Sequence, residues 1–196
     1  MSIDKKYLAK IRKDLNGYGA TRLGIMGIAN DALHHAKRAI FALHRNNLAE
    51  AEERIMAAEN KFREIETKYG KEDRIYDEGA YRAALEEYVE AKIFSAFLRG
   101  EKIGEVKGFG IEPETYVAGL ADVPGELLRF AIRAATARNL PEVRRAAAVS
   151  DDIMVEIMEM NLTSYLRNKA DQAKQAALKL ETILFEASLR LEDTRK

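Results

Sequence analysis

The chain has 196 residues, of which 47% are hydrophobic and 33% charged, with 32 basic and 32 acidic side chains. This length fits one domain spanning residues 1–196, and the absence of cysteine excludes disulfides and thiolate metal sites. A dedicated duplex-DNA binder usually has a basic excess, so any nucleic-acid contact is expected from a local patch. No apolar run approaches the roughly 20 residues of a transmembrane helix, and the N-terminus lacks a signal-peptide core. We therefore expect a cytoplasmic protein with no membrane partner.

Helical periodicity dominates the first 70 residues. The segment from about residue 4 to residue 45 has apolar residues at helical spacing, interrupted by Gly17, Gly19, Gly24 and Gly27. Each glycine costs a helix roughly 1 kcal/mol relative to alanine, so we predict a kink or break here, or the close approach of another helix. Asn46 and Asn47 predict a turn with an N-cap, a helix follows over residues 48–69, and Gly70 predicts its end.

The rest of the chain is also predicted to be helical. A third helix is expected from residue 72 or 73 to residue 99, followed by a glycine-rich loop over residues 100–110. Pro113 predicts the start of a helix that reaches about residue 138, with a kink at Pro124. A short helix to residue 148, a helix capped by Ser150 that ends near residue 165, and a last helix over residues 167–191 follow. The expected fold is all-α, a single-domain bundle of about seven helices.

Two glutamates lie on one face of the third expected helix. In LEEYVEA (residues 85–91), Glu87 and Glu90 are three residues apart and therefore share a face. Alanines lie one turn away from Glu87, and Phe94 lies two turns away. A carboxylate in such an apolar stripe is costly unless it is paired or binds a metal.

A second acidic pair lies in GLADVPGE (residues 119–126), where Asp122 and Glu126 are four residues apart. The residues around Asp122 are small and leave room for an ion. Pro124 removes the backbone donor to the Leu120 carbonyl, which is then free to bind a cation or water.

If the two helices pack antiparallel, four carboxylates converge. Oxygen ligands suit Mg²⁺ or Mn²⁺, which can activate water and offset charge on a phosphate. A pair of surface ion pairs, with Arg82 and Arg129 as partners, is the simpler interpretation, and spacing alone favours it because such acidic spacings are common by chance.

Other chemistries find little support. A ferritin-like dimetal bundle needs Glu-x-x-His pairs, and none precedes His34, His35 or His44. The adjacent His34 and His35 fit an ordinary surface or interhelical role. No phosphate-binding glycine loop, nucleophile elbow or catalytic triad is recognisable. Two basic clusters fit either a phosphodiester path or ion pairing: Lys37 and Arg38 with His44 and Arg45, and Arg82.

At these same residues the sequence resembles the translin family, and specifically its Trax-like (translin-associated factor X) branch. The matching segments are AKRAIFALHR at residues 36–45, EYVEA at residues 87–91, YVAGLAD at residues 116–122 and GELLR at residues 125–129. The resemblance is collinear over nearly the whole chain and implies a translin-like α-α superhelix. The glycine cluster, Pro124 and the short loop over residues 104–110 depart from eukaryotic Trax. A short, self-sufficient chain of this kind resembles the archaeal or other prokaryotic members.

The resemblance implies a Mg²⁺- or Mn²⁺-dependent endoribonuclease with Glu87, Glu90 and Asp122 as catalytic metal-binding residues. Glu126 matches a further acid of the same motif and is expected to be a ligand or to lie beside the ligands. The expected RNA-binding residues are Arg82, Lys37, Arg38 and Arg45. The expected partners are single-stranded or duplex RNA, single-stranded DNA and further copies of the chain in a homo-oligomer, an octamer by analogy, with the acids facing an inner cavity.

Two other functions remain open at this point. One is a translin-like scaffold that holds RNA or DNA without cleaving it. The other is a helical metal-dependent pyrophosphatase, which also uses clustered glutamates.

Overall fold

The computed structural model describes residues 3–70 and 75–193, with side chains as far as residue 190. Within these residues the chain forms six α-helices, one short 3-10 helix and no strand, which confirms the all-α class. The expectation of about seven helices was one too many. The elements are α1 (Lys5–His44), α2 (Leu48–Tyr69), η1 (Ile75–Asp77), α3 (Gly79–Arg99), α4 (Pro113–Thr136), α5 (Leu140–Met158) and α6 (Ser164–Asp193).

The predicted break among the N-terminal glycines was wrong, because α1 runs without interruption over 40 residues. A continuing helix keeps its backbone hydrogen bonds, and these outweigh the modest cost of each glycine. The alternative expectation, close approach of another helix, is confirmed at one position. A Cβ on Gly24 would lie 2.9 Å from Cζ of Tyr69 and closer still to its hydroxyl, whereas Gly17, Gly19 and Gly27 face open space.

The sequence predicted two helices on either side of Ser150, but the structure has one, α5. Ser150 is a buried residue inside this helix and not a cap. The buried apolar residues keep helical spacing on both sides of it, from Val143 to Ile157, so a single stripe spans the whole element. Pro124 likewise lies inside α4, which continues through it.

Several predicted boundaries are confirmed. Asn47 caps α2 by accepting a hydrogen bond from the backbone N–H of Glu50 at 3.2 Å, and Asn46 adopts φ 57° in the turn before it. Gly100 ends α3 in the left-handed conformation with φ 69°, and Pro113 stands in the first turn of α4. The predicted start of the third helix at residue 72 or 73 lies outside the described residues, and α3 begins at Gly79.

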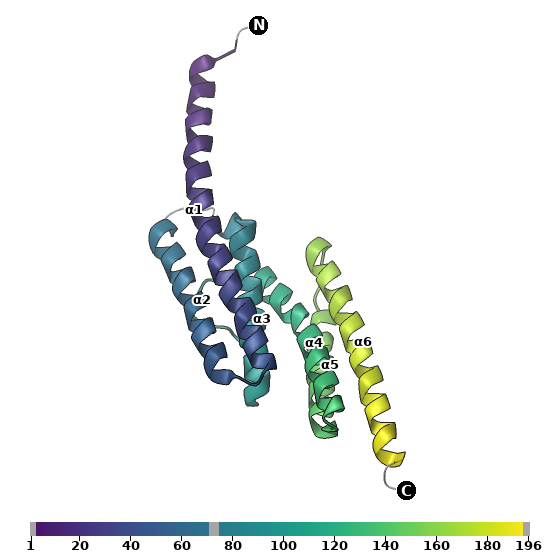
Figure 1. The fold of residues 1–196 in the computed structure, drawn as a ribbon. Helices are drawn as coiled ribbons and strands as arrows, with labels where there is room; N and C mark the ends of the chain where they lie inside the picture. The colour runs from purple at the N-terminus through teal and green to yellow at the C-terminus, as the bar shows by residue number, and fades with distance from the viewer. Residues whose placement is uncertain (1–2, 71–74, 194–196) are drawn as a thin grey trace.

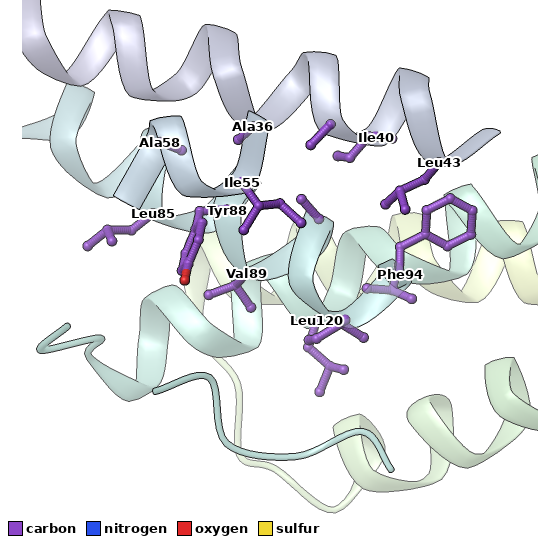
Figure 2. Packing of buried hydrophobic residues seen from close by; sticks show 14 of the residues in the cluster. Ala36, Ile40, Leu43, Ile55, Ala58, Leu85, Tyr88, Val89, Phe94 and Leu120 are labelled. Atoms are coloured by element: carbon purple, nitrogen blue, oxygen red, sulfur yellow. The ribbon is translucent and has the colours of Figure 1, made fainter. Parts of the chain in front are cut away.

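The helices form two groups joined through α3 and α4 (Figure 1). Helix α1 packs against α2 and α3, and α4 packs against α3, α5 and α6. Residues from α1, α2, α3 and α4 meet in one apolar core, among them Ile40, Ile55, Val89 and Leu120 (Figure 2). Among the described helices, none is both long and apolar enough to cross a membrane.

Candidate functional site

The close contact between α3 and α4 depends on a missing side chain. A Cβ on Gly119 would lie 2.6 Å from the carbonyl oxygen of Glu86 and 2.8 Å from Cβ of Val89. Only glycine therefore allows α4 to approach the α3 backbone this closely. The approach brings the two acidic segments predicted from the sequence against each other.

Glu90 is the most deeply buried of the four predicted acids, with 6% of its surface exposed. Burial is the main cause that raises its pKa to about 9, and the neighbouring charges of Glu87, Asp122 and Glu126 contribute to the same rise. Its carboxyl forms neither an ion pair nor a hydrogen bond among the described residues. At neutral pH Glu90 therefore holds a proton, unless a cation approaches and compensates its charge.

The charges of the other three acids affect Glu90 and one another. Burial raises the pKa of Glu87, the charge of Lys37 opposes this, and Asp122 and Glu126 raise it again. Mutual repulsion of this kind requires the carboxylates to lie close together in a poorly solvated region. The four acids therefore lie near enough to affect one another's charge, although no three of the described Asp, Glu or His side chains are placed to share a metal ion.

Lys169 of α6 supplies a cation to this cluster. Its Nζ contacts Oδ2 of Asp122 and lies 3.6 Å from Oε2 of Glu86. The same oxygen of Glu86 accepts a hydrogen bond from the hydroxyl of Tyr165 at 2.7 Å. Burial lowers the pKa of Lys169, but the hydrogen bond and charge of Asp122 outweigh this and raise it above its usual value. Lys169 is therefore a fixed positive charge, with a side chain only 16% exposed.

His44, at the end of α1, pairs with the fourth acid. Its Nε2 contacts Oε2 of Glu126, and its ring packs against Phe94 with a centroid distance of 4.8 Å. Nδ1 of His44 is buried and has no hydrogen-bond partner among the described residues. Nε2 is therefore the ring nitrogen that faces the carboxylate and can donate a hydrogen bond to it. Arg129 lies further from Glu126, at 4.0 Å.

The donor set fits a hard divalent cation in its chemistry. It consists of carboxylate oxygens, and the buried, uncompensated Glu90 is the kind of group that such a cation stabilises. The side chains themselves are not arranged around an ion. Among the described residues, no group of three or more Asp, Glu or His side chains is positioned to hold a metal. Asp122 and Glu126 instead pair with Lys169 and His44.

Comparison with known proteins places the chain in a family. The sequence model of the translin family matches residues 21–191. The chain belongs to the translin family. Among curated proteins, no sequence matches it.

Solved structures share the fold of this translin-family chain. AfC3PO in complex with duplex RNA is 22% identical with a TM-score of 0.84, and the match covers 94% of this chain and 97% of that one. A crystal structure of AfC3PO alone is 24% identical with a TM-score of 0.84, covering 94% and 98%. Apo-NeC3PO is 18% identical with a TM-score of 0.79, covering 95% and 99%. At these identities the likeness shows the fold.

The four predicted RNA-binding residues differ in how they relate to the acids. Lys37 lies near enough to Glu87 to lower its pKa, and Arg38 is exposed on the same helix. Arg45 instead pairs with Glu50 at 2.7 Å, and Arg82 is exposed in the first turn of α3. The ion-pair interpretation of the acids was right for Asp122 and Glu126, and Arg129 is within 4.0 Å of Glu126, but Glu87 and Glu90 have no ion-pair partner among the described residues and Arg82 pairs with none of the four.

Sequence reasoning missed Lys169 and the pairing of His44. His44 stood in the AKRAIFALHR segment, and its place on the apolar stripe with Ile40 and Leu43 was a signal that it faces the interior. Lys169 had no such signal, because it is one of several cations on a long polar helix and only the packing of α6 on α4 turns it inward.

Proposed function

We propose that this chain is an RNA-binding, divalent-metal-dependent endoribonuclease of the Trax-like branch that works as a homo-oligomer. The observation that carries the proposal is the buried, unpaired carboxyl of Glu90, whose pKa is raised by burial and by the charges of three further acids. A fold whose purpose is only structural gains nothing from this arrangement, since it costs stability. Family membership and the similar fold of AfC3PO, which has been solved in a complex with duplex RNA, support the choice of RNA.

Glu87, Glu90 and Asp122 would hold the cation, Mg²⁺ or Mn²⁺, with Glu126 as a further ligand or beside the ligands. The chemistry that such a cation supplies when bound is polarisation of the scissile phosphate and activation of a water. Cation binding would also offset the mutual repulsion of the acids, so the cluster is most stable when loaded.

The chain's own residues have separate roles in hydrolysis. The reaction forms a P–O bond from water, breaks the P–O bond to the leaving ribose oxygen, and transfers one proton from the water and one to that oxygen. The proton from the water would pass to a carboxylate of the cluster, since burial raises the pKa of its members Glu87 and Glu90 above that of an ordinary glutamate. Lys37 and Arg38 on α1 would contact RNA phosphates beside the site.

The test uses the full chain with RNA labelled at either end. Cleavage in Mg²⁺ or Mn²⁺ that stops on chelation is the expected result. Retention of intact RNA under both metals would contradict the nuclease proposal.

That second outcome would favour a non-catalytic RNA-binding scaffold. The pairing of Lys169 with Asp122 and of His44 with Glu126 is the observation on its side, because these contacts already occupy two of the four acids without a metal.

A further inference from the structure

The N-terminal part of α1 extends beyond the ends of α2 and α3 (Figure 1). An apolar row runs along it through Tyr7, Ile11 and Leu15, with Leu8 beside it, and these side chains are 60%, 36%, 61% and 46% exposed. Residues 7, 11 and 15 are four apart and therefore share one face. We call this face, together with its flanking cations, the α1 extension. An isolated chain leaves this apolar face in water.

The α1 extension also has a net positive charge, because five exposed cations outnumber the exposed Asp4 and Asp14. Lys6, Lys10 and Lys13 form a row next to the apolar one, and Lys5 and Arg12 lie on its other side. Among the described residues, none of these five side chains has an ion-pair partner. The contrast with α2 is clear, because there Lys68 pairs with Glu64 and Arg63 with Glu59 within the helix.

A second exposed surface has the opposite charge. On the C-terminal half of α5, Val155 and Met158 are 63% and 66% exposed. Next to them lies a row of acids at helical spacing, Asp152, Glu156 and Glu159, and Asp151 adds a fourth. None of these acids has an ion-pair partner among the described residues. We call residues 151–160 the α5 patch.

A hollow of about 220 Å³ continues the α5 patch toward α6. Met158, Met160, Leu162 and Ala170 contribute apolar atoms to its lining, and Asp171 contributes a further carboxylate, while Arg167 and Lys174 also line it. Exposed methionines adapt to the shape of an apolar partner. The hollow therefore gives the α5 patch room for a large side chain.

We infer that the α1 extension of one copy docks on the α5 patch of a second copy of this chain. Each surface is an exposed helix with an apolar row beside a charged row, and the two charges are opposite. Docking buries both apolar rows and pairs Lys6, Lys10 and Lys13 with the three-acid row. This inference specifies a contact within the homo-oligomer of the proposed function.

The contact must join different copies. Helix α1 is one continuous element of 40 residues, ~60 Å long, and its second half is fixed against α2 and α3. It therefore cannot fold back onto α5 of its own chain without breaking. The contact joins two different surfaces, so two copies can exchange it reciprocally in a dimer, or repeated docking generates a ring when the rotation closes.

A second copy fits both surfaces better than other partners do. An anionic lipid surface or RNA would attract the α1 extension, but both would repel the acids of the α5 patch. RNA would also leave the aliphatic side chains of the α1 extension exposed to water.

The test uses two triple variants of the full chain. The first is Lys6→Glu/Lys10→Glu/Lys13→Glu, and the second is Asp152→Lys/Glu156→Lys/Glu159→Lys. Molar mass is measured by sedimentation and light scattering without RNA or metal, so the result is independent of nuclease activity. Circular dichroism checks that each variant folds, and Lys102→Glu/Arg138→Glu, at two exposed positions elsewhere, is the control for a change in net charge.

We expect each triple variant alone to associate about tenfold or more weakly than the wild type, and the control to associate normally. An equimolar mixture of the two triple variants should recover the wild-type mass, because each α1 extension then finds an α5 patch of opposite charge. A monomeric wild type, unchanged association of either variant, or a mixture that does not recover would overturn the inference. So would a first variant that assembles normally but loses binding to anionic vesicles or RNA, since the partner would then be lipid or nucleic acid.

Discussion

Nζ of Lys169 contacts Oδ2 of Asp122 across the interface between α6 and α4, 47 residues away in sequence. The contact places a tethered cation on one of the four acids. Lys169 also lowers the pKa of Glu87 and of Glu90 through its charge. The ammonium group thus performs part of the charge compensation that a divalent cation would complete.

Replacing Lys169 with methionine is expected to raise the affinity for Mn²⁺. Methionine keeps the unbranched side chain as far as Cε but lacks the ammonium group, which contacts Asp122 and repels an incoming cation. The gain should be on the order of tenfold, as for a partly buried charge pair. Calorimetric titration with Mn²⁺ measures it, with Lys179→Met, exposed on the same helix, as the control. Unchanged or weaker binding would show that Lys169 does not oppose the metal.

Replacing Glu90 with glutamine should stabilise the metal-free chain at alkaline pH. The pKa of Glu90 is about 9 in the folded chain against 4.5 as the ordinary value, so between these values the unfolded chain releases a proton that the folded chain keeps. The free energy of unfolding of the wild type therefore falls as pH rises from about 4.5 to about 9. Glutamine does not titrate, so the variant lacks this loss of unfolding free energy, which is on the order of a few kcal/mol. Urea unfolding at pH 5 and pH 8.5 compares the two; equal slopes with pH would contradict the burial of an unpaired Glu90.

Asp122→Asn should abolish Mg²⁺-dependent RNA cleavage while leaving the fold and the assembled mass unchanged. Asparagine keeps the shape of the side chain and can still accept a hydrogen bond from Lys169, but it lacks the negative charge that holds a cation. Asp77→Asn, at an exposed position of η1, is the matched control. Undiminished cleavage by Asp122→Asn would remove Asp122 from the catalytic set.

Two glycines of α4 should respond to alanine in opposite directions. At Gly119 the new methyl would meet the Glu86 carbonyl oxygen at 2.6 Å, so α3 and α4 must move apart, at a cost of about 1–3 kcal/mol. At Gly125 nothing lies within 4 Å, and alanine should stabilise the helix by about 0.5–1 kcal/mol. Thermal unfolding of both variants tests the pair. A neutral Gly119→Ala would mean that the close approach does not hold the site together.

Lys37→Ala should weaken RNA retention more than Arg45→Ala does. The charge of Lys37 reaches the acidic site, whereas Arg45 is already paired with Glu50. Loss of one phosphate contact reduces the slope of log affinity against log salt by about 1. Filter binding over a range of salt concentrations, with metal omitted, measures both variants. Equal effects would mean that RNA does not pass beside Lys37.

Sequence periodicity predicted most elements correctly, because helix ends depend on local chemistry. Asn47, Gly100 and Pro113 mark their boundaries through contacts within a few residues, and each boundary was confirmed. The two failures have different causes. Ser150 has the chemistry of a cap, but a continuous buried stripe carries α5 through it. The glycines of α1 are tolerated because the backbone hydrogen bonds of a continuing helix outweigh the modest cost of each glycine.

The candidate site divides in the same way. The sequence by itself determined that Glu87 and Glu90 share one helix face and Asp122 and Glu126 another, since helical spacing is a local property. Only the tertiary structure decided that these faces meet, because that depends on the bare backbone of Gly119 against α3. It also decided that Glu90 is the buried member and that Lys169 and His44 are the partners, because burial and long-range pairing are set by how distant helices pack.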